Sequence, residues 1–101
     1  MRTSTTRRYA YHGSNRDVDT AAEQLTTTSV PALQGILVRA DPSNTGTVYV
    51  GTSSSVTAGS TGATDGMPLL AGESLELEVR DPSTIYVIAS ANNQVVYWFA
   101  N

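Results

Sequence analysis

Two copies of one short pattern dominate this sequence, and each reads β-prone run, Asp-Pro-Ser triplet, β-prone run with a central tyrosine. The copies span residues 37–50 and 77–87. Proline fixes φ near −65°, and an aspartate side chain can bond to the backbone two residues ahead, so each triplet predicts a tight turn. We interpret Leu33–Gly51 as a β-hairpin whose loop closes at Asn44-Thr45-Gly46, and the second copy as a repeat of the same unit.

Further β-prone runs continue to the C-terminus, with turn residues every eight to twelve positions. This spacing predicts an all-β protein, a compact antiparallel β-sandwich or jelly roll of about seven short strands. The expected strands cover residues 22–25, 35–40, 47–51, 67–70, 75–80, 84–89 and 94–99. A short helix over Asp19–Thr28 is an alternative on propensity, but the β-branched run Thr26–Val30 before Pro31 favours a strand.

The strand pattern also predicts the core, because alternate residues of a strand share one face. The inward positions are Ile36, Val38, Val48, Val50, Leu75, Leu77, Val79, Ile85 and Val87. Thr52–Thr64 consists of small residues around a single valine, and we expect it to be a surface loop between the two repeated units.

The first twenty residues differ in charge from the rest of the chain. They hold four of the six arginines, whereas the remainder sets two arginines against seven carboxylates. The composition predicts a basic N-terminal arm over residues 1–20 and a β-sandwich domain over residues 21–101. Two interpretations remain open: a disordered leader, or an arm that orders on a partner. Tyr9 and Tyr11, close to Arg7 and Arg8, favour the arm because tyrosine and arginine are enriched in binding hot spots.

The last predicted strand carries bulky apolar residues on both faces, from Val95 to Phe99. The second face must therefore be covered, either by the leader or the 52–64 loop, or by another chain, which we favour. We expect a homo-oligomer interface formed by Val96 and Trp98, or by Tyr97 and Phe99 if the register is reversed.

The residues needed for catalysis or metal binding are not assembled in the sequence. The single histidine, His12, has no nucleophile near it, and Asp41 and Asp81 are explained as turn formers. The other acidic residues form no calcium loop, and the glycines lack the strand–loop–helix setting of a phosphate site. We expect no enzyme, no metal and no cofactor. No apolar run is long enough to span a membrane, and the acidic body would repel nucleic acid, so neither partner is expected.

The turn and strand motifs together resemble those of small structural proteins of tailed bacteriophages. The resemblance rests on RADPSNTGTVYVG at residues 39–51, Asp65-Gly66, Pro68-Leu69, Ala71-Gly72-Glu73-Ser74, Ile85–Ile88 and Val95. It covers about residues 22–99 and points to capsid decoration (cement) or head-fibre proteins, which are compact β-sandwiches without catalytic residues. The resemblance implies a location on the capsid exterior after synthesis in the host cytoplasm, with a trimer as first choice and a dimer as second.

Two functions of different class follow from these observations. In the first, the protein stabilises the shell by bridging subunits of the major capsid protein, and the arm makes the contact through Arg2, Arg7, Arg8, Tyr9, Tyr11 and Arg16. In the second, it is a head-fibre or tail-associated module that recognises host-surface carbohydrate at the Asn92-Asn93-Gln94 turn, near Tyr97 and Trp98. The basic arm and the two-faced last strand favour the first.

Overall fold

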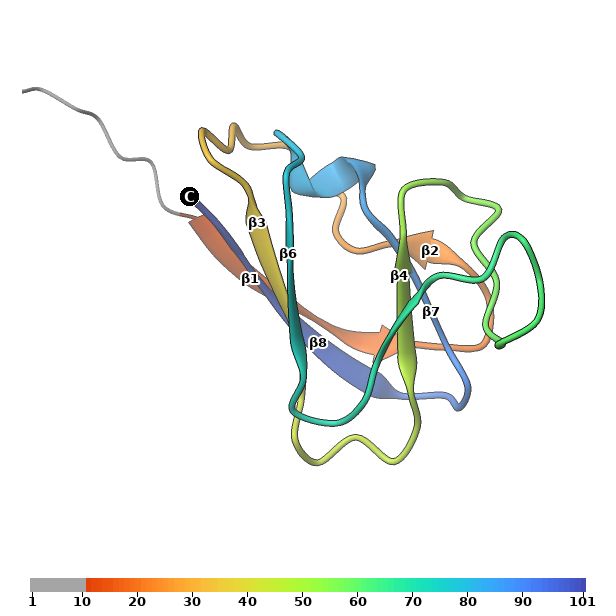
Figure 1. Cartoon of the computed structure of the whole chain (residues 1–101). Coiled ribbons are helices and arrows are strands. Elements are labelled where there is room, and N and C mark those ends of the chain that lie inside the picture. The colour runs from red at the N-terminus through yellow and green to blue at the C-terminus, as the bar shows by residue number, and fades with distance from the viewer. Residues whose placement is uncertain (1–10) are drawn as a thin grey trace, which may run out of the picture.

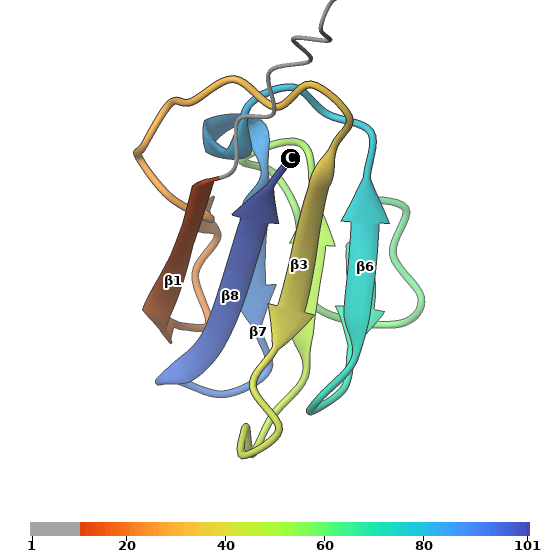
Figure 2. The same cartoon turned by 90° about the vertical axis from the view of Figure 1, so that its left-hand side faces the viewer.

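The computed structural model describes residues 11–101, which form eight strands in two stacked antiparallel sheets (Figure 1). The strands are β1 (Tyr11–Val18), β2 (Glu23–Gln24), β3 (Ile36–Ala40), β4 (Val48–Gly51), β5 (Met67–Leu69), β6 (Ser74–Leu77), β7 (Tyr86–Ala89) and β8 (Gln94–Ala100), with a 3₁₀ turn, η1, at Pro82–Thr84. Sheet A has the order β1-β8-β3-β6 (Figure 2). Sheet B has the order β2-β7-β4-β5. The predicted all-β sandwich is confirmed.

The chain changes sheet at almost every connection. Only β4 and β5 follow one another within a single sheet, and every other consecutive pair of strands crosses between sheet A and sheet B. Apart from β4 and β5, the strands that lie side by side in each sheet therefore come from distant parts of the chain, as in a jelly roll.

The two Asp-Pro-Ser triplets are turns, as predicted, but the predicted β-hairpin is wrong. Oδ1 of Asp41 accepts hydrogen bonds from the backbone N (2.8 Å) and Oγ (2.6 Å) of Ser43, and Oδ1 of Asp81 accepts both from Ser83 at 2.8 Å. Each turn carries the chain from sheet A to sheet B. The strand β3 pairs with β8 on one side and β6 on the other, so it has no free edge for β4.

The repeated units pair with each other instead of within themselves. The first strands of the two copies, β3 and β6, are antiparallel neighbours in sheet A, and the second strands, β4 and β7, are antiparallel neighbours in sheet B. The internal repeat of the sequence therefore supplies adjacent strands to both layers of the sandwich.

The predicted core is confirmed at six positions and partly at three. Ile36, Val38, Val48, Val50, Ile85 and Val87 are buried, while Leu75, Leu77 and Val79 are half-buried against the cluster. The sandwich also buries residues that the strand pattern did not select, among them Val18, Leu25, Leu69, Val96 and Trp98. The strand β6 ends at Leu77, before the predicted end at residue 80, so Val79 lies beyond the sheet.

The predicted arm is wrong over its second half. Residues 11–18 form β1, an edge strand of sheet A that pairs with β8 from Tyr11 opposite Ala100 onward. The body thus includes Tyr11–Val18, which the prediction placed in the arm before the boundary at 21, and Arg16 lies in a strand. Residues 1–10, with Arg2, Arg7, Arg8 and Tyr9, lie outside the described part of the chain.

The sequence of β1 lacks the usual alternation of apolar and polar residues, because its inward positions include residues without a large apolar side chain. A Cβ atom on Gly13 would lie 2.7 Å from Nε1 of Trp98, so the indole ring occupies the space of a side chain there. The amide of Asn15 faces inward too, and donates to the carbonyl oxygen of Leu25 at 3.2 Å. A strand with glycine and asparagine at its inward positions shows no apolar period in its sequence.

The 52–64 segment is a loop, as predicted, but it has its own anchors. Val56 is buried and packs where Gly51 and Gly66 leave room for it. The Asp65 carboxylate accepts hydrogen bonds from Oγ1 of Thr57 and from the backbone N of Gly62, both at 2.7 Å. These contacts close the loop on itself.

We predict that replacing Gly13→Ala destabilises the fold by about 1–3 kcal/mol, because the new methyl group overlaps the Trp98 ring and forces it to shift. Urea unfolding followed by tryptophan fluorescence measures both the loss of stability and the altered ring environment. Ser14→Ala, on the exposed side of the same strand, is the control and should change neither. An unaltered emission maximum in Gly13→Ala would show that the ring does not lie against β1.

We also predict that Ile36→Ala costs about 2–5 kcal/mol, since Ile36 is fully buried. Its cross-strand neighbour Leu77 is only half-buried, so Leu77→Ala should cost less. Chemical unfolding of the two variants under the same conditions gives the difference, and a larger loss for Leu77→Ala would contradict the observed packing.

Candidate functional site

The outer face of sheet A is formed by two rows of side chains that cross all four strands. In the first row, His12, Phe99, Leu37 and Glu76 are successive partners from β1 to β6. In the second row, Ser14, Tyr97, Arg39 and Ser74 are successive partners in the same strand order. Residues opposite one another in an antiparallel pair lie side by side on one face, so these eight side chains form one continuous surface.

The centre of this surface is apolar. Phe99 is 42% exposed, Leu37 39% and Tyr97 37%, and all three come from the two middle strands, β8 and β3. We call them the apolar strip. His12 and Arg39 border it, and together they line a shallow groove along β8. Large apolar side chains gathered in this way on a folded monomer are typical of an interaction surface.

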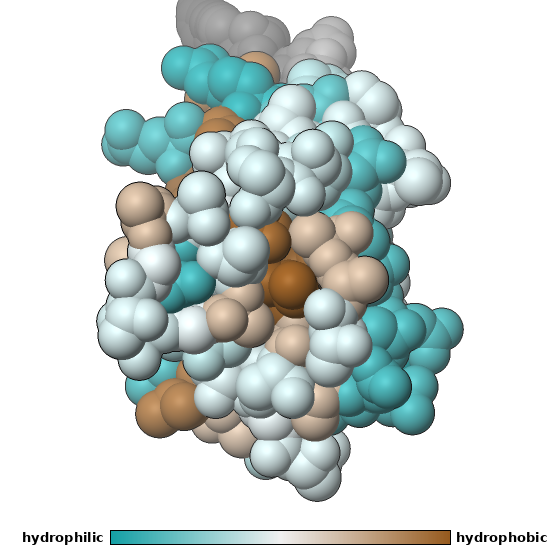
Figure 3. All heavy atoms as spheres, turned by 90° about the vertical axis from the view of Figure 1, so that its right-hand side faces the viewer, coloured by the Kyte–Doolittle hydropathy of each residue, from teal (hydrophilic) through white to brown (hydrophobic). Residues whose placement is uncertain are grey.

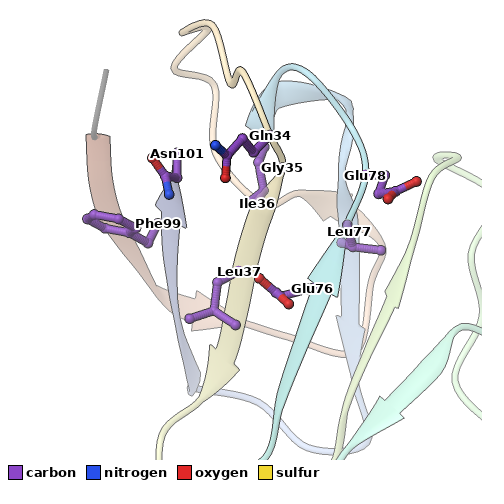
Figure 4. A pocket seen from close by; sticks show the side chains of 9 residues that line it. All are labelled: Gln34, Gly35, Ile36, Leu37, Glu76, Leu77, Glu78, Phe99 and Asn101. Atoms are coloured by element: carbon purple, nitrogen blue, oxygen red, sulfur yellow. The ribbon is translucent and has the colours of Figure 1, made fainter. Parts of the chain in front are cut away.

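A second groove lies beside the strip at one end of β3, β6 and β8 (Figure 4). Phe99 and Leu37 lie along it, the carboxylates of Glu76 and Glu78 border it, and the amides of Gln34 and Asn101 close one end. The backbone holds this end in place, since the Asn101 carbonyl oxygen accepts from the backbone N of Gln34 at 2.6 Å. The groove combines apolar, amide and carboxylate groups.

Tyr97 is fixed on the surface by a hydrogen bond to the first Asp-Pro-Ser turn. Its hydroxyl donates to Oδ2 of Asp41 at 2.6 Å. Hydrogen bonds from Ser43, then from Tyr97, lower the pKa of Asp41 to about 2 from its ordinary 3.8, and the nearby Arg16 adds a smaller effect. The turn therefore fixes the hydroxyl end of Tyr97, which lies opposite Arg39 in the sheet.

The start of β8 is clamped to the connection between β3 and β4. The Asn44 side chain bonds to both the backbone N and the carbonyl oxygen of Val95, at 2.9 Å each. Gln94 is buried, and its amide donates to Thr45 Oγ1 and accepts from Gly46 N. This clamp sets the position of β8 and thereby places Tyr97 and Phe99 between β1 and β3.

The outer face of sheet B offers a different surface. Ile88 occupies an outward position beside Tyr49, yet it is only 8% exposed, because residues of the 52–66 loop lie over this side. Figure 3 shows mostly weakly polar residues on this side, with one small hydrophobic spot at its centre. The contrast makes the outer face of sheet A the stronger candidate for a binding surface.

The predicted oligomer interface is half wrong. Val96 and Trp98 point into the core and are 0% and 5% exposed, so they are not available to a partner. The alternative pair, Tyr97 and Phe99, lies on the outer face of sheet A. The 52–64 loop does not cover it, because that loop belongs to the sheet B side.

The other predicted site residues are distributed between this surface and structural roles. Arg16 lies on β1 near Asp41, while Tyr11 begins β1 and lines a groove with Trp98 and Val30. The Asn92-Asn93-Gln94 turn, predicted to bind carbohydrate, is occupied by structural contacts: Asn92 Oδ1 accepts from Thr20 N, Asn93 N donates to Asp19, and Gln94 is buried. Three residues of this surface were not predicted as site residues: Leu37, Arg39 and Glu76. Their alternation with inward apolar residues indicated an outward face.

The perturbed carboxylates serve the loops and turns. Hydrogen bonds lower the pKa of Asp65, chiefly from Thr57, and of Asp81, chiefly from Ser29. A general acid needs the opposite shift. Burial raises the pKa of Glu23, which lies at the β2 edge of sheet B. Within residues 11–101 no three metal-ligating side chains come together, and no helix is long and apolar enough to cross a membrane.

Comparisons with protein-family models, with curated proteins and with solved structures found no match for this chain.

We predict that Tyr97→Phe raises the pKa of Asp41 from about 2 toward 3.8, because one of its hydrogen-bond donors is removed. The depressed pKa stabilises the folded state above pH 3.8, and this contribution is lost as the pH falls toward 2. NMR titration of the Asp41 carboxyl carbon measures the shift. Tyr86→Phe is the control, and an equal shift there would show that the hydroxyl of Tyr97 is not the donor.

Proposed function

We propose that this protein is a structural component of a phage virion, which binds the capsid exterior and stabilises the shell by bridging neighbouring subunits of the major capsid protein. The observation that carries the proposal is the apolar strip on the outer face of sheet A. A rigid jelly roll that keeps three large apolar side chains on one sheet face is suited to protein–protein contacts. The function requires no catalytic chemistry.

The N-terminal sequence is the proposed capsid contact. Arg2, Arg7, Arg8 and Tyr9 precede β1, and β1 is an edge strand of the sandwich. A basic and aromatic segment joined to the body at a sheet edge can reach a neighbouring subunit without disturbing the core. Charge contacts of this kind weaken as salt screens them.

The β-sandwich body contributes a rigid scaffold, and its many copies on the shell would add their contacts together. Jelly rolls occur in viral capsid proteins and in lectins, a likeness of fold that alone assigns no function. Many copies on a closed shell add modest contacts by multivalency, so each copy needs only a small interface to make the particle more robust.

Carbohydrate recognition is the second candidate, and the groove in Figure 4 is the observation that favours it. The aromatic ring of Phe99 can stack on a sugar face, while Gln34, Asn101 and Glu76 offer donors and acceptors to hydroxyl groups. Among the residues that line the groove only Phe99 is aromatic, which makes this function weaker than capsid binding in our assessment.

The test compares particles produced with and without this chain. We expect particles lacking it to assemble but to rupture at a lower temperature, and to regain stability when purified protein is added back. A variant with Arg7→Ala and Arg8→Ala should rebind more weakly, with a larger loss at low salt than at high salt. Arg80→Ala, on the exposed surface of the body, is the charge control.

Particles that are equally robust without the protein would contradict capsid stabilisation. If the purified protein then binds host polysaccharide, and Phe99→Ala removes that binding, the carbohydrate function replaces it.

A further inference from the structure

We propose that two copies of this chain pair face to face through the outer face of sheet A, across a two-fold axis that runs parallel to β8 and β3 and between them. The proposal names the partner of the apolar strip. It does not depend on capsid binding, and it is tested on the purified protein alone.

The charges on this face are arranged asymmetrically about its centre. On one flank, β1 carries His12, Arg16 and Asp17, and Arg16 lies near Asp41; on the other, β6 and the residues after it carry Glu76, Glu78 and Arg80. The apolar strip lies between the two flanks. Among residues 11–101, neither His12 nor either glutamate has an ion-pair or hydrogen-bond partner within the same chain. The complementary pair on this face is His12 and Glu76, which end the same row on opposite flanks: an imidazole N–H can donate a hydrogen bond to a carboxylate.

Two arrangements align the strands of such a face with those of a second copy. Two sheets that face each other across a two-fold axis have that axis in the plane between them. If the axis lay perpendicular to the strands, each strand would face its own copy, and the acidic flank would meet the acidic flank. An axis parallel to the strands, between β8 and β3, brings β1 opposite the partner's β6. Like charges face to face are costly, so the charges select the parallel axis.

The same axis matches the two rows residue by residue. Rotation about an axis parallel to the strands leaves the position of each row along the strands unchanged and reverses the order of the strands. The first row therefore faces the first row of the partner, with its residues in the opposite order. His12 then lies opposite the partner's Glu76, and Phe99 lies opposite the partner's Leu37. In the second row, Arg39 lies opposite the partner's Tyr97, where the guanidinium can stack on the ring. Each contact occurs twice.

The size of the face predicts a weak dimer. Four strands about 4.8 Å apart and roughly five residues long at about 3.4 Å per residue give a flat footprint of roughly 320 Å². Standard stable interfaces bury about 800 Å² on each partner. We therefore expect dissociation in the micromolar range or above. The two-fold axis also favours a dimer over the trimer that the sequence resemblance implies.

The experiment is analytical ultracentrifugation of the full chain from about 1 to several hundred micromolar. We expect a monomer–dimer equilibrium. Glu76→Arg places a positive charge opposite the partner's His12, and His12→Glu places a negative charge opposite the partner's Glu76. Each single variant should weaken the dimer about tenfold or more. The double variant restores a carboxylate opposite a basic side chain and should recover most of the affinity.

Two further variants separate the face from general surface effects. Phe99→Ser should abolish the dimer without changing the unfolding midpoint, because Phe99 lies outside the core. Ser54→Arg, in the exposed 52–66 loop, adds a charge elsewhere and should leave the dimer unchanged.

Three results would overturn the proposal. A protein that stays monomeric over the whole range has no such interface. A trimer would rule out the two-fold axis. A dimer that persists in Phe99→Ser, or whose single charge variants are not rescued by the double exchange, would place the contact on another surface. A monomer would leave the apolar strip free for the contact with the capsid, and capsid binding itself is measured separately, on particles.

Discussion

The fold depends on where the chain is forced to leave one sheet for the other. At Asp41 and Asp81 a carboxylate holds the backbone N and hydroxyl of the serine two residues ahead, and the proline between them cannot continue a sheet ladder. Both turns end a strand of sheet A and start a connection to sheet B. Since β3 already has neighbours on both edges, the crossing is the only way to bury the next strand.

The same turn also shapes the candidate binding surface. Asp41 accepts the hydroxyl of Tyr97, and the connection that follows it clamps the start of β8 through Asn44 and Gln94. The turn that takes the chain from sheet A to sheet B thus also fixes β8, the strand that supplies two of the three residues of the apolar strip. The positions of Tyr97 and Phe99 on the outer face of sheet A therefore depend on this turn and on the connection that follows it.

The two sides of the sandwich have separate tasks. The sheet B side is covered by the 52–66 loop, which is anchored by Val56 and Asp65 and presents mainly small polar residues. The sheet A side keeps an apolar centre between His12 on β1 and Glu76 on β6. The two faces therefore differ in how much apolar surface they expose, which is the ground for the proposed contact through sheet A.

The sequence by itself determined the fold class, the strand positions from residue 22 onward, and most of the core. It could do so because alternation at Ile36, Val38, Val48, Val50 and Val87 and the chemistry of Asp-Pro-Ser are local properties. The sequence also showed that β8 is apolar on both faces.

Only the tertiary structure decided which strands pair, because the partners of β3 and β8 are far away in the chain. It made Val96 and Trp98 core residues and left Tyr97 and Phe99 outside. It also revealed β1, whose inward glycine is explained only by the Trp98 ring that fills its place. Because Gly13 has no side chain, it adds nothing to an apolar periodicity in β1. Trp98, whose ring fills the space beside it, lies 85 positions further along the chain.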